Sequence, residues 1–285
     1  MKKYNYILVA LDLTPIDVHL IRYASFLASV VGAEKVYFVH NIKKYEISSL
    51  FADQLEGVDL DQVVGEELND KVSTYFEGQV PWEVFISEDP YTESLIQYVV
   101  RKYGISLTIV GNKNQSKGTG ILPAKLLRML RCDVFSLPSV DDFSLNSVWA
   151  GTDFSNASRK IFSLLELFQK VRNSTITAAH VYEVPVHFSP YVPREEMHPR
   201  IVRHSEKRFA RFIKSLNFPG TIQQKIIPGR DASHASLLVR AAERANADLL
   251  VIGDKGGNTF SSLLIGSTAE EIFYNNIQIP LWVVK

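Results

Sequence analysis

The sequence is poor in the residue that builds disulfides and cysteine-rich metal sites. Cys132 is its one cysteine in 285 residues, so an intramolecular disulfide and a multi-cysteine metal site are excluded. Such a composition is typical of a reducing compartment, and we expect Cys132 to be a small core residue.

Long apolar runs and net charge are lacking as well. The apolar run after Lys2 and Lys3 is interrupted by Asp12, so neither a signal peptide nor a membrane span fits. Lys plus Arg and Asp plus Glu both number 31, which gives a formal net charge of zero. That balance does not support binding to nucleic acid or to an anionic membrane. We therefore expect a cytoplasmic protein without a nucleic-acid or membrane partner.

Apolar runs typical of buried strands alternate with segments of helical periodicity along the chain. The hydrophobic content of 46% is enough for two ordinary cores. The predicted strands cover residues 6–11, 35–40, 80–86, 107–111 and 134–137, and then residues 148–153, 175–181, 222–227, 249–252 and 281–284. The predicted helices cover residues 16–31, about 65–76, 92–103 and 124–130, and then about 157–171, about 195–216, 234–245 and 268–274.

The second half of the chain repeats the first at a nearly constant offset. Three landmark pairs show it: Asp12 and Asp153 at an offset of 141, His40 and His180 at 140, and Gly111 and Gly253 at 142. Strands that alternate with helices imply right-handed crossovers and a parallel sheet covered on both faces. We therefore predict an α/β protein with two tandem doubly wound, mainly parallel five-stranded sheets, in domains 1–140 and 145–285.

A glycine-flanked loop follows the fourth predicted strand of the second half. Two residues separate Gly253 from Gly256, and nine more separate Gly256 from Gly266 and Ser267. Glycines let the backbone come close to a ligand, and the helix N-terminus that follows favours an anion. Ser267 and Glu270 also fit a capping box, so the Ser267 side chain has two interpretations, a helix cap and a phosphate contact. The spacing differs from the GxxxxGK[ST] and GxGxxG loops.

This glycine spacing resembles that of the universal stress protein family, and the repeated strands and helices extend the resemblance over nearly the whole chain. In that family the same spacing, closed by Gly with Ser or Thr, marks members that bind ATP. The resemblance implies a Rossmann-like fold of the adenine nucleotide alpha hydrolase-like type, with ATP as cofactor and any Mg²⁺ carried by its phosphates. The cofactor-binding residues that it implies are Thr152, Asp153, Val181, Gly253, Gly256, Gly266, Ser267 and Thr268.

Individual positions sharpen this prediction. Asp153 has two interpretations, a contact to the base or ribose, which the resemblance implies, and a helix N-cap. Val181 corresponds to the family position whose backbone meets adenine. In the first half, Asn114 stands at the second glycine position, and only six residues separate Gly111 from Gly118. We therefore expect a degenerate loop in the first domain and one ATP per chain, held by the second.

No motif indicates a catalytic residue or a dedicated metal site, because the histidines lack ligand spacing and no general base stands beside the glycines. The predicted function is an ATP-binding regulatory or stress-response protein with at most weak ATPase activity. The alternatives are slow ATP hydrolysis at the same loop and a nucleotide-free scaffold for protein contacts. The resemblance also implies an intramolecular pseudo-dimer through residues 134–137 and 281–284. The resemblance is also compatible with the association of two chains into a homodimer and with an unknown protein partner.

Overall fold

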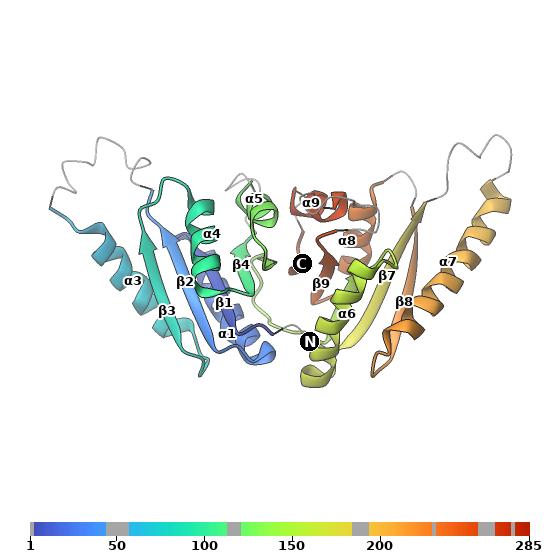
Figure 1. Cartoon of the computed structure of the whole chain (residues 1–285), viewed down its shortest axis with the longest axis horizontal. Coiled ribbons are helices and arrows are strands. Elements are labelled where there is room, and N and C mark those ends of the chain that lie inside the picture. The colour runs from blue at the N-terminus through green and yellow to red at the C-terminus, as the bar shows by residue number, and fades with distance from the viewer. Residues whose placement is uncertain are drawn as a thin grey trace. The chain divides into compact units, whose positions relative to one another are not determined.

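The computed structural model describes residues 3–43, 57–112, 121–183, 194–229, 232–255, 266–274 and 277–285. The chain divides into two compact units, Lys3–Phe143 and Ser144–Lys285, which we call the first and second domains. Figure 1 shows each domain as a sheet with helices on both faces.

The side chains on either side of the domain boundary pack into different domains. Phe143 packs edge-on against Tyr23, with 5.3 Å between the ring centroids. The next residue, Ser144, donates a hydrogen bond from its hydroxyl to Asp248 at 3.1 Å. Aromatic packing therefore ends the first domain, and a carboxylate of the second domain holds the start of the next segment.

The first domain is a five-stranded parallel sheet with the strand order β3-β2-β1-β4-β5. Its described elements are, in chain order, β1 (Tyr6–Leu11), α1 (Ile16–Val31), β2 (Lys35–Asn41), α3 (Leu60–Tyr75), β3 (Trp82–Ser87), α4 (Thr92–Tyr103), β4 (Leu107–Gly111), α5 (Ile121–Met129) and β5 (Asp133–Leu137).

The second domain repeats this topology with the strand order β8-β7-β6-β9-β10, again parallel throughout. Its described elements are β6 (Ser147–Gly151), α6 (Asn156–Arg172), β7 (Thr175–Glu183), α7 (Arg194–Leu216), β8 (Ile222–Gly229), α8 (His234–Arg244), β9 (Leu249–Gly253), α9 (Ser267–Tyr274) and β10 (Leu281–Val284).

The order of the strands determines which helices share a face of each sheet. Right-handed crossovers that run outward from the first strand and then return put the first two helices on one face and the last two on the other. Contacts agree with this, since α1 touches α3, α4 touches α5 and α8 touches α9. In the second domain, Arg159 of α6 donates a hydrogen bond to the backbone of Ser215 in α7 at 3.1 Å.

The predicted fold class is confirmed, and two helices that have the predicted bounds are followed by glycine. α1 and α4 have the predicted bounds, and each is followed by a glycine in the left-handed region, Gly32 with φ 68° and Gly104 with φ 64°. Such glycine caps are readable from sequence because other residues pay a steric cost in that conformation.

Two helix starts in the first domain differ from the prediction. α3 begins at Leu60 and not near Gly65, because the Asp59 side chain caps it by accepting a hydrogen bond from the amide of Gln62 at 3.1 Å. α5 begins at Ile121, three residues before the predicted start at residue 124, and Pro123 is its third residue. Proline fits there because the first four amides of a helix have no partner within the helix.

Candidate functional site

The candidate site of the second domain lies where the strand order reverses. β6 pairs with β7 on one side and with β9 on the other, and ligands of doubly wound sheets bind beyond the carboxyl ends of strands at such a point. Thr152 and Asp153 directly follow β6, and Gly253 is the last residue of β9. The fold therefore brings these three predicted residues to one edge of the sheet.

Asp153 stabilises the turn between β6 and α6. Its Oδ1 atom accepts hydrogen bonds from the Ser155 amide at 3.0 Å and from the Ser158 hydroxyl at 2.7 Å. The N-cap of α6 is Ser155, whose hydroxyl accepts a hydrogen bond from the Ser158 amide at 3.2 Å. The helix-cap interpretation of Asp153 is therefore wrong, and its side chain is exposed at the strand edge.

Thr152 is buried, and its polar atoms bind neighbouring protein groups. Its hydroxyl accepts a hydrogen bond from the amide of Phe154 at 3.1 Å, and its carbonyl lies 2.8 Å from Nδ1 of His180. Burial lowers the pKa of His180 below its ordinary value, so the neutral ring donates this bond from Nδ1. Val181 is the next residue of β7 and pairs with Ile227 of β8.

Phe154 forms the wall of the turn beside Asp153 and is a residue that the sequence analysis missed. Its backbone is in the left-handed region, with φ 65°. Its ring lies over the His180 ring with 4.2 Å between centroids, and the guanidinium of Arg208 lies 5.2 Å from its centroid. Leu13, at the equivalent place in the first domain, has φ 60°. Both turns thus place a bulky residue in a conformation that costs roughly 1–2 kcal/mol.

Replacement of Leu13 by glycine is expected to raise the free energy of unfolding by up to about 1 kcal/mol, because relief of the left-handed strain exceeds the entropy that glycine adds to the unfolded chain. Leu13 is 37% exposed, so little packing is lost. Urea unfolding checks this, with Leu13→Ala as the control that truncates the side chain and keeps the strain. Equal stability of the two variants would contradict the prediction.

The ends of the glycine-flanked loop are held together by backbone hydrogen bonds. Asp254 donates from its amide to Val284 of β10 at 2.9 Å, and its carbonyl accepts from the amide of Gly266 at 2.6 Å. A Cβ atom on Gly253 would lie 3.3 Å from the Lys255 carbonyl oxygen, so a larger residue would crowd this turn. Gly256 and the rest of residues 256–265 lie outside the described residues.

α9 begins directly after this loop, so its N-terminus lies at the same edge of the sheet. Its first residue is Ser267, and the Gly266 carbonyl accepts the hydrogen bond from the Glu270 amide at 3.1 Å. Gly266 therefore occupies the capping position that the capping-box interpretation assigned to Ser267, and Ser267 is exposed. Ser267 and Thr268 lie in the first turn, whose amides have no partner within the helix and favour an anion.

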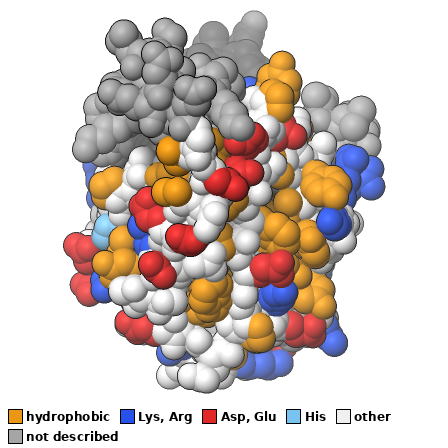
Figure 2. All heavy atoms as spheres, turned by 90° about the vertical axis from the view of Figure 1, so that its left-hand side faces the viewer, with side chains coloured by type: hydrophobic (Ala, Val, Ile, Leu, Met, Phe, Trp, Pro, Cys, Tyr) orange, Lys and Arg blue, Asp and Glu red, His pale blue; other side chains and the backbone are white. Residues whose placement is uncertain are grey.

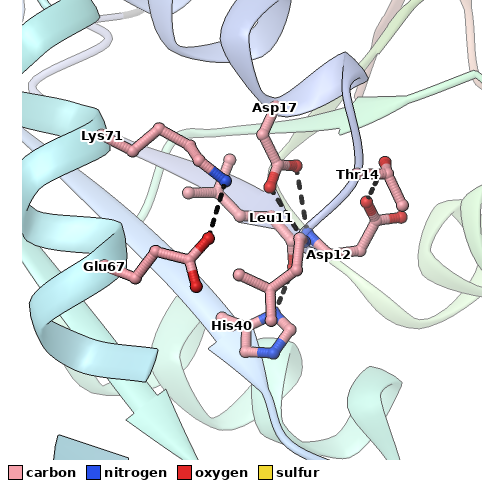
Figure 3. Close-up of polar contacts among 8 residues, drawn as sticks. Leu11, Asp12, Thr14, Asp17, His40, Glu67 and Lys71 are labelled. Atoms are coloured by element: carbon pink, nitrogen blue, oxygen red, sulfur yellow. Dashed lines mark hydrogen bonds and ion pairs between the residues drawn. The ribbon is translucent and has the colours of Figure 1, made fainter. Parts of the chain in front are cut away.

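The equivalent edge of the first domain contains a buried carboxylate that the sequence analysis also missed. Asp17 is 0% exposed, and its two oxygens accept hydrogen bonds from the amides of Asp12 at 3.1 Å and Leu13 at 2.9 Å. Figure 3 shows this carboxylate pointing at the turn, with Lys71 and Glu67 of α3 nearby. The two α3 residues form an ion pair at 3.5 Å.

In both domains a side chain from the first turn of the following helix accepts a hydrogen bond from a backbone amide of the turn, but the residue differs. Ser158 stands 141 positions after Asp17, and its hydroxyl accepts a hydrogen bond from the Asp153 amide at 3.3 Å. The histidine is conserved between the two turns, since Nδ1 of His40 lies 3.0 Å from the carbonyl of Leu11. The offset of 141 that relates Asp12 to Asp153 also relates Asp17 to Ser158, so applying it to neighbouring residues would have identified both.

The first domain has the same strand end as the second but a different loop sequence. The amide of Asn112 donates to Leu137 of β5 at 2.7 Å, which matches the bond from Asp254 to β10. Asn114 and Gly118, on which the prediction of a degenerate loop rests, lie outside the described residues.

These features define a tandem α/β protein of the Rossmann-like class with a helix N-terminus at the reversal point of its second sheet. Over the described ranges, no helix is long and apolar enough to cross a membrane. No group of three His, Cys, Asp or Glu side chains in that part of the chain is arranged to hold a metal ion.

Comparison with known proteins identifies the family. The sequence model of the universal stress protein family matches residues 146–285. A universal stress protein from Archaeoglobus fulgidus has the same fold, with a TM-score of 0.64 and a sequence identity of 16%. The structural alignment covers 99% of this chain and 97% of that chain. A functionally unknown protein from Pseudomonas aeruginosa has a TM-score of 0.67 and a sequence identity of 15%, and the alignment covers 99% of this chain and 92% of that chain. The search of curated proteins found no match.

The second domain belongs to the universal stress protein family. The match of the family model covers the second domain, and the full-length structural likeness shows that the first domain has the same fold. The predicted tandem arrangement is therefore confirmed.

Proposed function

We propose that the second domain binds ATP and that the protein acts as a nucleotide-responsive regulator in the stress response. The observation that carries the proposal is the position of the α9 N-terminus at the same sheet edge as Asp153, where the strand order reverses. The first-turn amides of α9 suit the phosphates, and Asp153 suits the hydroxyl or amino groups of the nucleoside. Any Mg²⁺ would be bound through the phosphate oxygens.

The residues of this edge fit a nucleotide in two further respects. The Asp153 side chain is exposed even though Oδ1 binds the turn, so a ligand can approach it. Gly253 and Gly266 flank the loop at positions where the backbone turns closely, as the short bond from the Gly266 amide to Asp254 indicates. Close approach of the backbone is what a phosphate loop requires.

Asp153→Asn is expected to weaken ATP binding about ten-fold or more, because a hydrogen bond to a charged group contributes about 1.5–3 kcal/mol. Asparagine retains Oδ1, the atom that accepts from Ser155 and Ser158, so the turn keeps its contacts while the charge is lost. The measurement is calorimetric titration of the full chain with ATP and Mg²⁺. Gly266→Val, which alters the loop end, is expected to weaken binding as well.

The matched control is Asp12→Asn, which makes the same change at the equivalent turn of the first domain. It is expected to leave the affinity unchanged, because the first domain lacks the complete glycine spacing. Equal affinity for the parent protein and all three variants would sink the proposal, as would absence of binding by the parent protein. Mass spectrometry of small molecules released on denaturation gives an independent check for a co-purified adenine nucleotide.

A further inference from the structure

The helix that joins the second and third strands carries opposite charge in the two domains. This helix is α3 in the first domain and α7 in the second. α3 together with its flanking residues, 59–77, contains six Asp and Glu against one Lys, a net charge of −5. Residues 194–216 contain seven Lys and Arg against three Glu, a net charge of +4. The zero net charge of the whole chain therefore conceals two strongly charged helices.

Six side chains of α7, five Lys or Arg and one His, form one stripe along the helix. They recur at intervals that keep them on one side of an α-helix, and all are exposed: Arg200, Arg203, His204, Lys207, Arg211 and Lys214. At 1.5 Å per residue the stripe is about 21 Å long. In the part of the chain that the structure describes, no carboxylate forms an ion pair with these six side chains.

α3 and its flanking residues carry an acidic stripe. Its exposed members are Glu66 and Asp70, four positions apart on one side of the helix, with the N-cap Asp59 before them and Glu77 after the end of the helix. Figure 2 views the side of the molecule that carries α3 and shows acidic side chains gathered there, with hydrophobic side chains among them. Val63, on the same side of α3, is 52% exposed. No Lys or Arg among the described residues pairs with Glu66 or Asp70.

We propose that α7 of one copy of this protein binds α3 of a second copy. The two stripes are opposite in sign, which is the electrostatic complementarity that selects partners and speeds their encounter. Like charges three and four positions apart repel within each stripe, so a partner of opposite charge relieves a repulsion that the single chain retains. Each copy carries one stripe of each sign, so the association is between identical chains.

A second copy fits the basic stripe better than a nucleic acid does. Polyanion binding relies on a positive field over a whole face, and this chain has no net charge. The exposed Val63 and Val58, 41% exposed, add apolar area at the start of α3. A protein surface can bury such area, whereas a phosphate backbone gains nothing from it.

The test is sedimentation of the full chain at low ionic strength and in about 1 M salt, where the Debye length falls to about 3 Å. We expect association at low ionic strength and single chains at high salt. The triple variant Arg203→Glu, Lys207→Glu and Arg211→Glu is expected to weaken self-association about ten-fold or more. Its matched control reverses three exposed basic residues outside α7, Arg101, Lys160 and Arg240, and is expected to associate like the parent protein.

A charge swap distinguishes a specific contact between the two helices from a general effect of charge. The variant Glu66→Lys, Asp70→Lys also loses self-association, because both of its stripes are basic. Mixing it with the α7 triple variant is expected to restore association, since the basic α3 of one variant then meets the acidic α7 of the other. The proposal is overturned if the parent protein stays a single chain at low ionic strength, if the control triple is equally disruptive, or if mixing restores nothing. Binding of duplex DNA or anionic vesicles without self-association would assign the stripe to another partner and overturn it too.

Discussion

Trp282→Ala is expected to lower the free energy of unfolding of the second domain by about 3–5 kcal/mol, the range for removal of a large aromatic side chain from a core. Trp282 is 0% exposed in β10, and its ring meets Phe168 of α6 edge-on with 5.7 Å between centroids. The substitution removes this contact between the sheet and α6 and leaves a cavity that close-packed neighbours fill only in part. The measurement is urea unfolding followed by far-ultraviolet circular dichroism.

The matched variant in the first domain is Phe135→Ala. Phe135 holds the equivalent place in β5, is likewise 0% exposed, and packs against Tyr23 with 5.1 Å between centroids. Each variant is expected to shift the unfolding transition of its own domain to lower urea, and Trp282→Phe is expected to recover most of the loss because it keeps a ring against Phe168. A loss below about 1 kcal/mol for Trp282→Ala would contradict the burial on which the prediction rests.

The helices that the sequence predicted best are those whose ends depend on local steric rules. α1 and α4 stop at Gly32 and Gly104 because only glycine enters the left-handed cap without cost. The start of α3 was missed because Asp59 is one of several acidic residues in its segment, and the sequence does not show which of them turns toward the helix amides. Capping is decided by backbone direction, which depends on where β2 and β3 place the ends of the connection.

The sequence predicted which strand ends form the site, but it did not predict the conformation of the turns that follow them. Asp153 and Gly253 lie at the predicted edge because parallel strands end together. Phe154 was missed because a phenylalanine gives no sign that its backbone will take φ 65°. Its conformation depends on the ring of His180 and on α7, and contacts between segments distant in sequence have no local signal. The capping-box interpretation placed the helix cap at Ser267, one residue after its observed position at Gly266, because contacts between segments distant in sequence have no local signal there either.

The buried carboxylate of Asp17 is expected to make the stability of the first domain depend on pH. Desolvation by burial is the largest cause that raises its pKa, and the Asp12 charge adds to it, whereas hydrogen bonds from the turn amides and the charge of Lys71 act in the opposite direction. The net result is a pKa of about 6, against 3.8 for an exposed aspartate. Between these two values the folded domain binds a proton that the unfolded chain does not.

The sign of the effect follows from proton linkage. Because the folded state binds the extra proton, the free energy of unfolding falls as the pH rises through this window, by about 3 kcal/mol for a shift of this size. The contribution is complete below about pH 4 and lost above about pH 6. Asp17→Ser installs the residue that the second domain has at Ser158 and removes the titrating group. The stability of this variant relative to the parent protein is therefore expected to rise by about 3 kcal/mol between pH 4 and pH 7.

The measurement is the urea midpoint and slope of the first-domain transition for both proteins across this range. The comparison between parent and variant cancels the titration of groups that do not interact with Asp17, so the difference reports Asp17 and its coupling to neighbours such as Asp12. The second-domain transition, where Ser158 carries no charge, serves as the internal control and is expected to be the same in both proteins. A difference between parent and variant that stays constant with pH would show that Asp17 titrates at its ordinary pKa, and that the turn amides and Lys71 outweigh its burial.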